Sequence, residues 1–462
     1  MSRSEIKSKN PAVAAYSKIG MRAGQFLFFG TQTPHDLASG RLVKGFADVP
    51  EDARKKLSGL CSMVMIVVTE ERILAQAWQI LTNMQELLAA HGSSLDQVVR
   101  QRFFLRDMRD ATYLEHAIRL FMPGSRPATT ILGATNDGVN EDIAVVADFI
   151  AIDSSSGLRR ENVSVPAIDH LTAPYPLASR AGQFIFTSQI AGIDAATGRP
   201  VQDFGALTAA ERELLEPPYT PEEETAVAQH AVIFRHMREI LKSQGAPLGS
   251  HIHQNTWLQI PMQAFGPVAK LRARLFAGSG NQAVSTALPI SRLRRHDAIQ
   301  EVAILALVPP GQHGSHRKVN PMAVHPLSGF YLPVVKAGPY ALTAGEVGID
   351  TSVPRFMGRY SDLGDEGRFL PYGRVHEEKQ VTVEAWWVYK KLETYLKASG
   401  MTMDDVVHQS VFMTQPAEFP ALERIAEQFF GPKLPPTSLV PIKGTTPYPQ
   451  ATLEIEVIAT PA

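Results

Sequence analysis

Two carboxylates in this sequence stand inside segments that are otherwise apolar, where proton-transfer chemistry is readily tuned. Glu456 lies in the run LEIEVIA, between Ile455 and Val457, and Asp148 lies in the run VVADFIA. Burial disfavours the charged form of a carboxyl group and raises its pKa towards the range of a general base. We therefore predict that Glu456 and Asp148 are catalytic general bases. The alternative is that both face outward from their strands.

A second candidate group is a cluster of arginines in the segment SRLRRHD. Arg292, with Arg294 and Arg295 beside it, could bind the carboxylate of a substrate, and the alternative is a solvated hairpin tip. His251 and His253 alternate in a predicted strand and would share one face, but no third ligand has a suitable spacing, so we predict no metal site. The sequence has no phosphate-binding glycine loop, no G-x-S-x-G motif and no setting for a nucleophilic cysteine, and we predict no cofactor.

The elements that must position these groups occur three times in the chain. Three similar segments contain glycines that end a helix, and these glycines, Gly92, Gly245 and Gly400, lie 153 and 155 residues apart. A period of that length is a whole domain and is too long for a solenoid repeat. The register extends upstream to three hairpins, RAGQFLFFGTQTP, RAGQFIFTSQIAG and KAGPYALTAGEVG. We predict three domains, at residues 1–155, 160–312 and 320–462.

Within each copy, the apolar pattern changes from the period of strands to that of helices. In the first copy, the hairpin precedes a helix with apolar residues from Leu74 to Leu88, then the strand VVRQRFFLRD, a second helix and two closing strands. This order predicts an α+β fold, a mixed β-sheet with two helices on one face. Each copy also has a long insertion after its hairpin, which either lines a common binding face or forms ordinary surface loops. The insertions are residues 41–70, 199–222 and 351–378.

The composition is that of a globular protein of about three domains. With 45 Lys and Arg against 46 Asp and Glu, the formal charge is −1, which gives no broad electrostatic reason to bind nucleic acid or an anionic membrane. The lone Cys61 excludes an intramolecular disulfide and suits a reducing compartment. The polar start MSRSEIKSKN is unlike a signal peptide, and no apolar run approaches the roughly 18 residues of a membrane-spanning helix. We therefore expect a cytoplasmic protein.

The three tandem copies resemble the RidA/YjgF family over essentially the whole chain. The resemblance is carried by the RAGQFLFFGTQ hairpin, the helix that ends at a glycine, and the ending LPPTSLVPI…LEIEVIA of the third copy. Members of this family are small domains of chorismate-mutase-like fold that assemble as homotrimers with a ligand cleft at each subunit boundary. Many hydrolyse enamines or imines and release ammonia. The resemblance implies that this chain is an intrachain pseudo-trimer, whose assembly is independent of concentration and whose three clefts are free to diverge.

The resemblance also assigns roles to individual positions, the first being an arginine in a P-A-R-S motif that holds the substrate carboxylate. Those positions read Thr129, Val284 and Thr437 here. Loss of a charge-assisted pair weakens carboxylate binding by on the order of 1–2 kcal/mol. We therefore predict that the chain is not a standard 2-iminoacid deaminase. Thr129 and Thr437 remain candidates for substrate binding, whereas Val284 offers no donor.

The family glutamate that orients the attacking water corresponds to Glu456 in the third copy, Asp148 in the first and Ala303 in the second. The end of the second copy is therefore predicted to be inactive or purely apolar. Further substrate-binding candidates come from the hairpins, although polar residues there could instead close turns. One hairpin position holds Gln32, Gln189 and Glu346, and the family's ligand-facing tyrosine is matched by Tyr16 and Tyr175, with Tyr331 nearby in the third copy.

Together these features predict a cofactor-independent hydrolase or deaminase that acts at clefts between the repeats on a small organic molecule, such as an enamine, an imine or a cyclic metabolite. A second hypothesis is a chorismatase-like enzyme acting on a cyclic or aromatic acid. A third is a non-catalytic protein that binds a small molecule. Ribonuclease activity, which has been attributed to this family, is disfavoured by the near-neutral charge. We expect a small-molecule substrate, no nucleic acid and no membrane among the partners, and further oligomerisation is left open.

Overall fold

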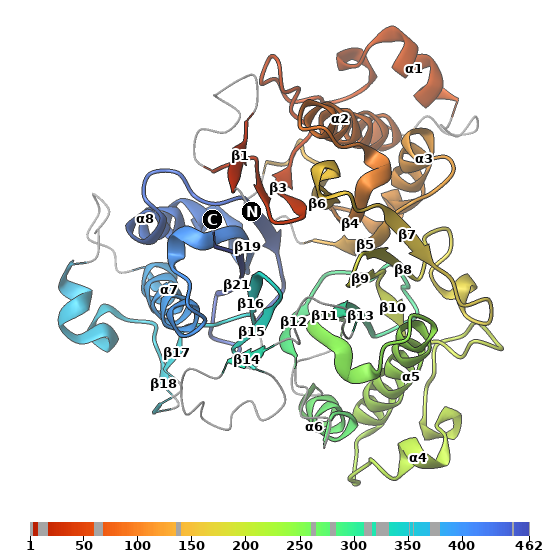
Figure 1. Cartoon of the computed structure of the whole chain (residues 1–462), viewed down its shortest axis with the longest axis vertical. Helices are drawn as coiled ribbons and strands as arrows, with labels where there is room; N and C mark the ends of the chain where they lie inside the picture. The colour runs from red at the N-terminus through yellow and green to blue at the C-terminus, as the bar shows by residue number, and fades with distance from the viewer. Residues whose placement is uncertain are drawn as a thin grey trace.

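The fold is described from a computed structural model, which describes residues 3–7, 17–59, 68–134, 140–259, 265–277, 283–308, 317–319, 332–350, 352–353, 355–369, 379–445 and 448–461. Three lobes surround a common centre, and the chain passes through them in turn (Figure 1). Each lobe contains one mixed sheet and a pair of packed helices, and we call the lobes repeats 1, 2 and 3. The chain therefore has the α+β fold that the sequence predicts. Within the described ranges, no helix has the length and apolar content needed to span a membrane.

Repeat 1 contains a six-stranded sheet in the order β1-β2-β3-β6-β4-β5. β4 and β5 are parallel, and the other neighbouring strands are antiparallel. The elements are β1 (Ser4–Ile6), β2 (Gly20–Ala23), β3 (Phe26–Gln32), α1 (Glu51–Ser58), α2 (Val68–Ala90), β4 (Val98–Leu105), α3 (Ala111–Phe121), β5 (Ala128–Gly133) and β6 (Val145–Ile152).

Repeat 2 has the same strand order in its sheet, β7-β8-β9-β13-β11-β12, and the short β10 also pairs with β13. Its elements are β7 (Arg160–Val163), β8 (Ala178–Ala181), β9 (Phe184–Thr187), β10 (Ile190–Ala191), α4 (Ala209–Arg212), α5 (Pro221–Ser243), β11 (His251–Leu258), α6 (Phe265–Leu275), β12 (Val284–Pro289) and β13 (Gln300–Leu307).

Repeat 3 repeats the order once more, β14-β15-β16-β21-β19-β20, with a separate hairpin of β17 and β18. Its elements are β14 (Arg317–Val319), β15 (Val334–Ala337), β16 (Tyr340–Thr343), β17 (Ile349–Asp350), β18 (Arg355–Phe356), α7 (Gln380–Ala398), β19 (Val406–Met413), α8 (Phe419–Phe430), β20 (Thr437–Pro441) and β21 (Leu453–Ala459).

Local sequence signals define the ends of the long helix in each repeat. At the start of α5, the Thr220 side chain accepts from the Glu223 N–H and the Glu223 carboxylate accepts from the Thr220 N–H, which is a capping box. Just beyond α2, α5 and α7, Gly92, Gly245 and Gly400 have φ of 73°, 70° and 74°. Glycine adopts this left-handed conformation without the penalty of a Cβ, so the predicted helix stops are confirmed.

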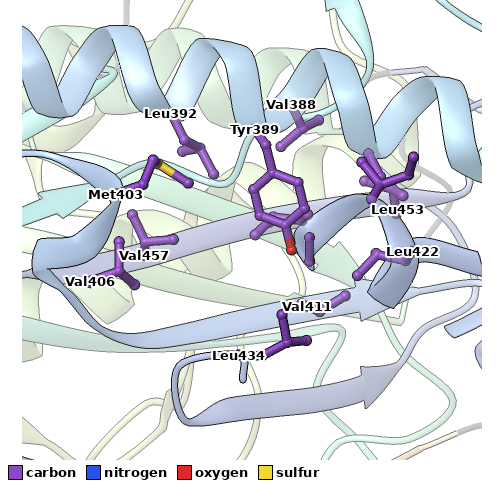
Figure 2. Packing of buried hydrophobic residues seen from close by; sticks show 14 of the residues in the cluster. Val388, Tyr389, Leu392, Met403, Val406, Val411, Leu422, Leu434, Leu453 and Val457 are labelled. Atoms are coloured by element: carbon purple, nitrogen blue, oxygen red, sulfur yellow. The ribbon is translucent and has the colours of Figure 1, made fainter. Parts of the chain in front are cut away.

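Each sheet buries one face under its two helices. In repeat 3, α7 lies across the sheet, and Val388, Tyr389 and Leu392 point from the helix towards Val411 and Val457 of the strands (Figure 2). α2 and α3 cover the sheet of repeat 1 in the same way. These helix-side faces form the cores of the individual repeats.

The opposite faces of the three sheets turn towards the common centre. Phe26, Phe184 and Tyr340, one from each repeat, pack against one another with ring centroids 5.5, 5.7 and 5.9 Å apart. Aromatic pairs at this spacing each contribute about 0.5–1.5 kcal/mol beyond the area they bury. A single apolar cluster at this centre draws residues from all three repeats, so the central faces hold the repeats together.

The three insertions lie at the outer ends of the lobes, where Figure 1 shows α1, α4 and the β17–β18 hairpin. α1 packs its apolar side against α2, as part of a small separate cluster. The cavities described below take no lining residue from the described parts of these insertions. The described parts of the insertions therefore do not line these cavities, and a binding face formed by the insertions stays a prediction.

One buried polar side chain on each long helix ties the helix to the last strand of its repeat. Gln76, Gln229 and Glu384 each accept a hydrogen bond from the backbone N–H that precedes this strand, at 2.7, 3.1 and 2.9 Å. Burial raises the pKa of Glu384 from its ordinary 4.5 to about 7. The two glutamines make the same contact without a charge to desolvate.

We expect the substitution Glu384→Gln to stabilise the protein, because two repeats already use glutamine at this position. The pKa of Glu384 is raised in the folded chain, so the wild type loses stability as pH rises from about 4.5 to about 7. The free energy of unfolding of the variant should exceed that of the wild type by up to about 3 kcal/mol at pH 8 and by little at pH 4. Urea denaturation at both pH values measures this, and a variant less stable than wild type at pH 8 would contradict it.

Candidate functional site

Buried charges join the repeats at their common centre, in a group that we call the axial network. In repeat 1, Arg102 Nε donates to both carboxylate oxygens of Asp148 at 2.9 Å. Arg102 Nη2 also donates to Ser410 Oγ of repeat 3 at 3.1 Å. Arg100 Nη2 lies 3.7 Å from Asp148 on the other side. The predicted base of repeat 1 is thus held by two arginines, one of which also binds repeat 3.

Glu456 takes the corresponding place in repeat 3 and binds repeat 2. Its Oε2 accepts hydrogen bonds from Thr286 Oγ1 at 2.6 Å and Asn255 Nδ2 at 3.2 Å, and it lies 3.1 Å from His253 Nε2. Arg102 Nη1 is 4.0 Å from the other carboxylate oxygen, which links the two halves of the network. The axial network therefore contains side chains from all three repeats.

The pKa values of these two carboxyls move in the direction opposite to the one predicted. Burial by itself would raise the pKa of Asp148, but the charges of Arg102 and Arg100 more than offset it and the pKa is lowered. Burial likewise opposes ionisation of Glu456, and the charge and hydrogen bond of His253 lower its pKa well below the ordinary range. The prediction of raised pKa values is wrong because the partners come from other strands and repeats. The catalytic role of both residues stays a prediction.

A small cavity lies beside the axial network, where the three repeats meet. Arg100, His253 and His408 line it from equivalent positions of the repeats, together with Ser410 and Glu456. Its volume of about 30 Å³ holds two or three water molecules, because one water needs roughly 10–15 Å³. Of the two predicted bases, Glu456 therefore faces a space that is too small for an organic metabolite.

Strand register shows which residues of the three repeats are equivalent. Arg102 pairs with Asp148, Asn255 with Ala303, and Ser410 with Glu456. The prediction that Ala303 takes the carboxylate position in repeat 2 is confirmed.

The register corrects two other assignments in repeat 2 by one residue. Thr129 and Thr437 each pair with a buried glutamine of the neighbouring strand. In repeat 2 the corresponding glutamine, Gln254, pairs with Ser285. The counterpart of the two threonines is therefore Ser285 and not Val284. The end of repeat 2 is thus more polar than predicted, since Ser285 is a hydroxyl residue.

The second correction concerns the hairpin of repeat 2. Gln32 pairs with Ala147 and Glu346 pairs with Ile455, and these partners are equivalent residues of the last strands. The equivalent residue of repeat 2, Val302, pairs with Ile190. Gln189 therefore lies one residue before the predicted position.

The predicted bases and the predicted threonines lie on opposite faces of their sheets. Tyr389 of α7 donates to Gln409 at 3.1 Å, and Gln409 donates to Thr437 at 2.8 Å, which places Thr437 on the helix side. Glu456 points to the centre, because side chains alternate along a strand. Repeat 1 has the same alternation. The structure does not bring the two kinds of candidate residue together in one cleft.

Three seams join the repeats, each between the edge strand of one repeat and the hairpin of the next. β5 meets the hairpin of repeat 2, β12 meets that of repeat 3, and β20 meets that of repeat 1. We call these seam 1/2, seam 2/3 and seam 3/1.

Seam 1/2 is closed by hydrogen bonds. Thr129 N–H donates to Ser188 Oγ at 3.0 Å, and Gln189 N–H donates to the Thr129 carbonyl at 3.2 Å. The side-chain amide of Gln189 then accepts from the Ile131 N–H at 2.9 Å and donates to the Ile131 carbonyl at 3.1 Å. The side chain of Gln189 thus continues the hydrogen-bond ladder of β5 across seam 1/2.

Seam 2/3 is occupied by charged residues. Lys391 of α7 donates to Glu346 at 2.6 Å and to the Val347 carbonyl at 2.8 Å, and both side chains are buried. Glu346 is therefore held in an ion pair within repeat 3. Across the seam, a Cβ added to Gly345 would lie 2.8 Å from Thr286 Oγ1, so the two repeats are in close contact.

The aromatic and arginine candidates serve mainly in contacts between repeats 1 and 2. Tyr175 is buried in the helix-side core of repeat 1, with Arg294 stacked 5.3 Å from its ring, and burial raises its pKa. Arg294 also pairs with Glu115 of repeat 1 at 3.1 Å. Arg292 is exposed, and its carbonyl accepts from the Gly133 N–H at 2.8 Å. Tyr16 and Tyr331 lie outside the described residues.

The two histidines of β11 do not share a face. A β-bulge separates their register, so His251 packs against Phe234 and Phe276 on the helix side, whereas His253 faces Glu456. The prediction of a common face is therefore wrong. Among the described residues, no three His, Cys, Asp or Glu side chains lie close enough together to hold a metal ion.

Seam 3/1 contains a cleft, which we call the seam cleft. Its polar compartment, of about 60 Å³, is lined by the predicted candidates Gln32 and Thr437, together with Ser17, Lys18, Ile19, Gly30, Thr31, Thr33 and Leu37. A second, mostly apolar compartment of about 130 Å³ shares Thr31 and Thr33 with the first. Two predicted substrate-binding residues, from distant parts of the chain, thus line one cavity.

Close backbone packing builds this cleft. Thr31 Oγ1 accepts from the Leu439 N–H at 2.9 Å, and the Lys18 N–H donates to the Leu434 carbonyl at 3.0 Å. A Cβ at Gly30 would lie 2.6 Å from the Thr437 nitrogen, so only glycine allows the hairpin of repeat 1 to approach β20 this closely.

Sequence reasoning missed a hydroxyl–imidazole pair in the seam cleft. Thr33 lines both compartments, and its Oγ1 lies 2.7 Å from Nδ1 of His35. Desolvation lowers the pKa of the half-buried His35 below 6.5, so its imidazole is neutral at pH 7. The two-residue spacing within GTQTPH is the local signal that could have identified the pair.

Sequence reasoning also missed two buried glutamates. They lie two residues before Ala303 and Glu456, the positions predicted for the catalytic carboxylate. Glu301 and Glu454 occupy equivalent places in β13 and β21, where repeat 1 has Val146. Burial raises the pKa of Glu301 to about 7, and its Oε2 has no hydrogen-bond partner among the described residues. Perturbed carboxyls of this kind are frequent at functional sites. The seam cleft, which has Val146 at this position, lacks such a carboxylate there.

Three mixed sheets with paired helices, joined at their seams, define an α+β protein built of RidA-like repeats. The family model described as Endoribonuclease L-PSP matches residues 7–151 and 322–461, which are most of repeats 1 and 3. These matches cover more than half of the chain, and the protein belongs to this family, the RidA/YjgF family.

Individual relatives are similar over about one repeat. The RutC family protein PH0854 of Pyrococcus horikoshii is 25% identical over 139 residues, which are 30% of this chain and 87% of that protein. A putative endoribonuclease structure from Klebsiella pneumoniae is 24% identical, covers 29% of this chain and 98% of its own, and has a TM-score of 0.27. A chorismatase structure is 11% identical, covers 79% of this chain and 93% of its own, and has a TM-score of 0.47.

The axial network leads to a test that separates structure from catalysis. We expect Asp148→Asn and Glu456→Gln each to lower the free energy of unfolding by about 3–5 kcal/mol, because each leaves buried partners uncompensated. Asp297→Asn, which breaks a half-exposed pair with Arg295, should cost about 0–1 kcal/mol. Both buried carboxyls have lowered pKa values, so their contribution is present above about pH 4 and is lost as pH falls further. Thermal unfolding at pH 7 measures the loss of stability. Variants of Asp148 or Glu456 that keep the stability of the wild type but lose turnover would favour purely catalytic roles for these residues.

Proposed function

We propose that this protein is a cofactor-independent hydrolase of the RidA type that acts on a small organic molecule in the seam cleft. The observation that carries the proposal is that Gln32 and Thr437 line one cavity there. The polar compartment is lined by hydroxyl and amide groups and by Lys18, and these donors suit a group that accepts hydrogen bonds, such as the C=N nitrogen of an imine. Threonine or serine stands at each position of the family arginine, so simple 2-imino acids are poor candidate substrates.

We assign proton transfer in the seam cleft to Thr33 and His35. With His35 in the Nε2–H tautomer, Nδ1 accepts the Thr33 hydroxyl proton while Thr33 Oγ1 accepts a proton from a bound water. The hydroxide adds to the carbon of the C=N bond, and protonated His35 returns its proton through Thr33 to the nitrogen, which gives a carbinolamine. The C–N bond then breaks while the hydroxyl proton passes to the nitrogen by way of Thr33 and His35. For an imine, the products are a carbonyl compound and ammonia, so the atoms balance without a cofactor.

A second candidate function is binding without catalysis. It is favoured by Val146, which replaces the carboxylate that the other two repeats carry at this position. Under this hypothesis the seam cleft senses or carries a ligand, and the protein returns it unchanged.

We expect His35→Gln to lower kcat by roughly 10²- to 10⁴-fold, the usual loss on removing a general base, with Thr33→Val acting in the same direction. Because the base must be neutral, the wild-type rate should fall as pH drops through the lowered pKa of His35, below 6.5. This acid limb should be absent from the residual activity of the variant. The measurement is ammonia release from a panel of imines and enamines between pH 5 and 9.

His91→Gln serves as the control, since His91 is also half-buried but lies at the end of α2 and outside the seam cleft. Its rate and pH profile should match those of the wild type. Full activity in His35→Gln would refute the proton-transfer assignment. Saturable binding of panel compounds with no turnover of any of them would instead support the non-catalytic function.

A further inference from the structure

The apolar compartment of the seam cleft exists because one side chain in repeat 1 is small. The residue just after β5 is Ala134, whereas the residues just after β12 and β20 are Ile290 and Ile442. Each of the three donates its N–H to the end of the parallel neighbouring strand, at 2.8, 2.9 and 2.9 Å, so the positions are equivalent. All three side chains are buried. The two isoleucines fill the volume that Ala134 leaves open.

A second substitution in repeat 1 makes the same space apolar. Val146 lines the compartment, while the equivalent residues Glu301 and Glu454 are carboxylates. Phe104 and Leu439, from repeats 1 and 3, form further walls. Seam 3/1 therefore has a small residue, Ala134, and an uncharged residue, Val146, at the two positions where the other repeats have isoleucine and glutamate.

The size of the compartment indicates what it holds. Its volume is about 130 Å³, and an engineered apolar cavity of about 150 Å³ binds benzene. A single six-membered aromatic ring is therefore the largest flat group that the compartment takes without rearrangement. The adjoining polar compartment, reached past Thr31 and Thr33, has room for a small substituent of the same molecule.

One charged residue also lines the apolar compartment. Arg106 is exposed at its mouth and donates to the Glu141 carbonyl, an uncharged acceptor. A guanidinium at the mouth of an apolar pocket favours a ligand with an anionic group at that end, since paired charge-assisted hydrogen bonds to a carboxylate are strong.

We propose that the seam cleft binds a monocyclic aryl carboxylate, with the ring beside Ala134, the carboxylate at Arg106 and the remaining polar substituent next to Gln32. The proposal deepens the proposed function, because it names the substrate class of the same cleft. Its test measures binding alone, so the two can fail separately.

The experiment titrates the full-length protein with phenylacetate, benzyl alcohol and acetate, using calorimetry or ligand-observed NMR. Wild type should bind phenylacetate at least tenfold more tightly than acetate. Ala134→Ile should weaken phenylacetate binding at least tenfold, because the larger side chain extends into the apolar compartment. Arg106→Gln should weaken phenylacetate but leave benzyl alcohol unchanged. Ala38→Ile, the same change at an exposed site in repeat 1, is the control.

Equal binding of phenylacetate by wild type and Ala134→Ile would overturn the proposal, as would equal binding of acetate and phenylacetate by wild type. Should Ala134→Ile fail to fold, Ala134→Val supplies an intermediate change and must weaken binding in the same direction. Binding of phenylacetate with no turnover of any aryl-substituted imine would leave this inference standing and refute the hydrolase. Turnover of imines that is unaffected by Ala134→Ile would refute this inference and leave the hydrolase proposal standing.

Discussion

The pairing of Arg102 with Asp148 and Ser410 is the interaction on which the arrangement of the repeats depends. Removing an arginine and a carboxylate from water costs several kcal/mol for each ion, and the cost is recovered only when geometry and additional hydrogen bonds are good. Here the guanidinium reaches two repeats at once, and Glu456 repeats the pattern with repeat 2. A rotation of repeat 3 against repeat 2 would separate Glu456 from its partners, and a rotation against repeat 1 would break the bond between Arg102 and Ser410. The network therefore fixes the orientation of the repeats, while the aromatic centre supplies apolar contact between them.

The sequence predicts the repeated fold well because the signals are local. Helix-ending glycines, apolar periods and hairpin motifs recur at fixed distances, and the sheets follow the predicted order. The errors arise where information is not local. The alignment of repeat 2 is wrong by one residue at Ser285 and again at Gln189, because both positions are defined by pairing with distant strands. The pKa of Glu456 is lowered by residues some 200 positions away, and a bulge that no local signal marks turns His251 away from His253.

The three seams show how one template diverges when the copies are fused. Gln189 fills seam 1/2 with an amide that completes a strand ladder, and seam 2/3 holds the buried pair of Lys391 and Glu346. Seam 3/1 has smaller residues, Thr31 and Ala134, and keeps a cleft. In a homotrimer each of these changes would appear three times. The arrangement therefore allows two seams to be optimised for cohesion while the third retains space for a ligand, and its residues are recruited from both ends of the chain.

The hydrogen bond between Thr31 and Leu439 spans 408 positions, and this has a consequence for biosynthesis. A ribosome must release the chain through β20 before this strand can dock on the hairpin of repeat 1, whereas the other two seams form between repeats that are adjacent in the sequence. During translation the first hairpin waits with an uncovered edge, the kind of surface that invites premature pairing with other nascent chains. Occupancy of the cleft by a small molecule would then report that all three repeats are made and that seam 3/1 is closed.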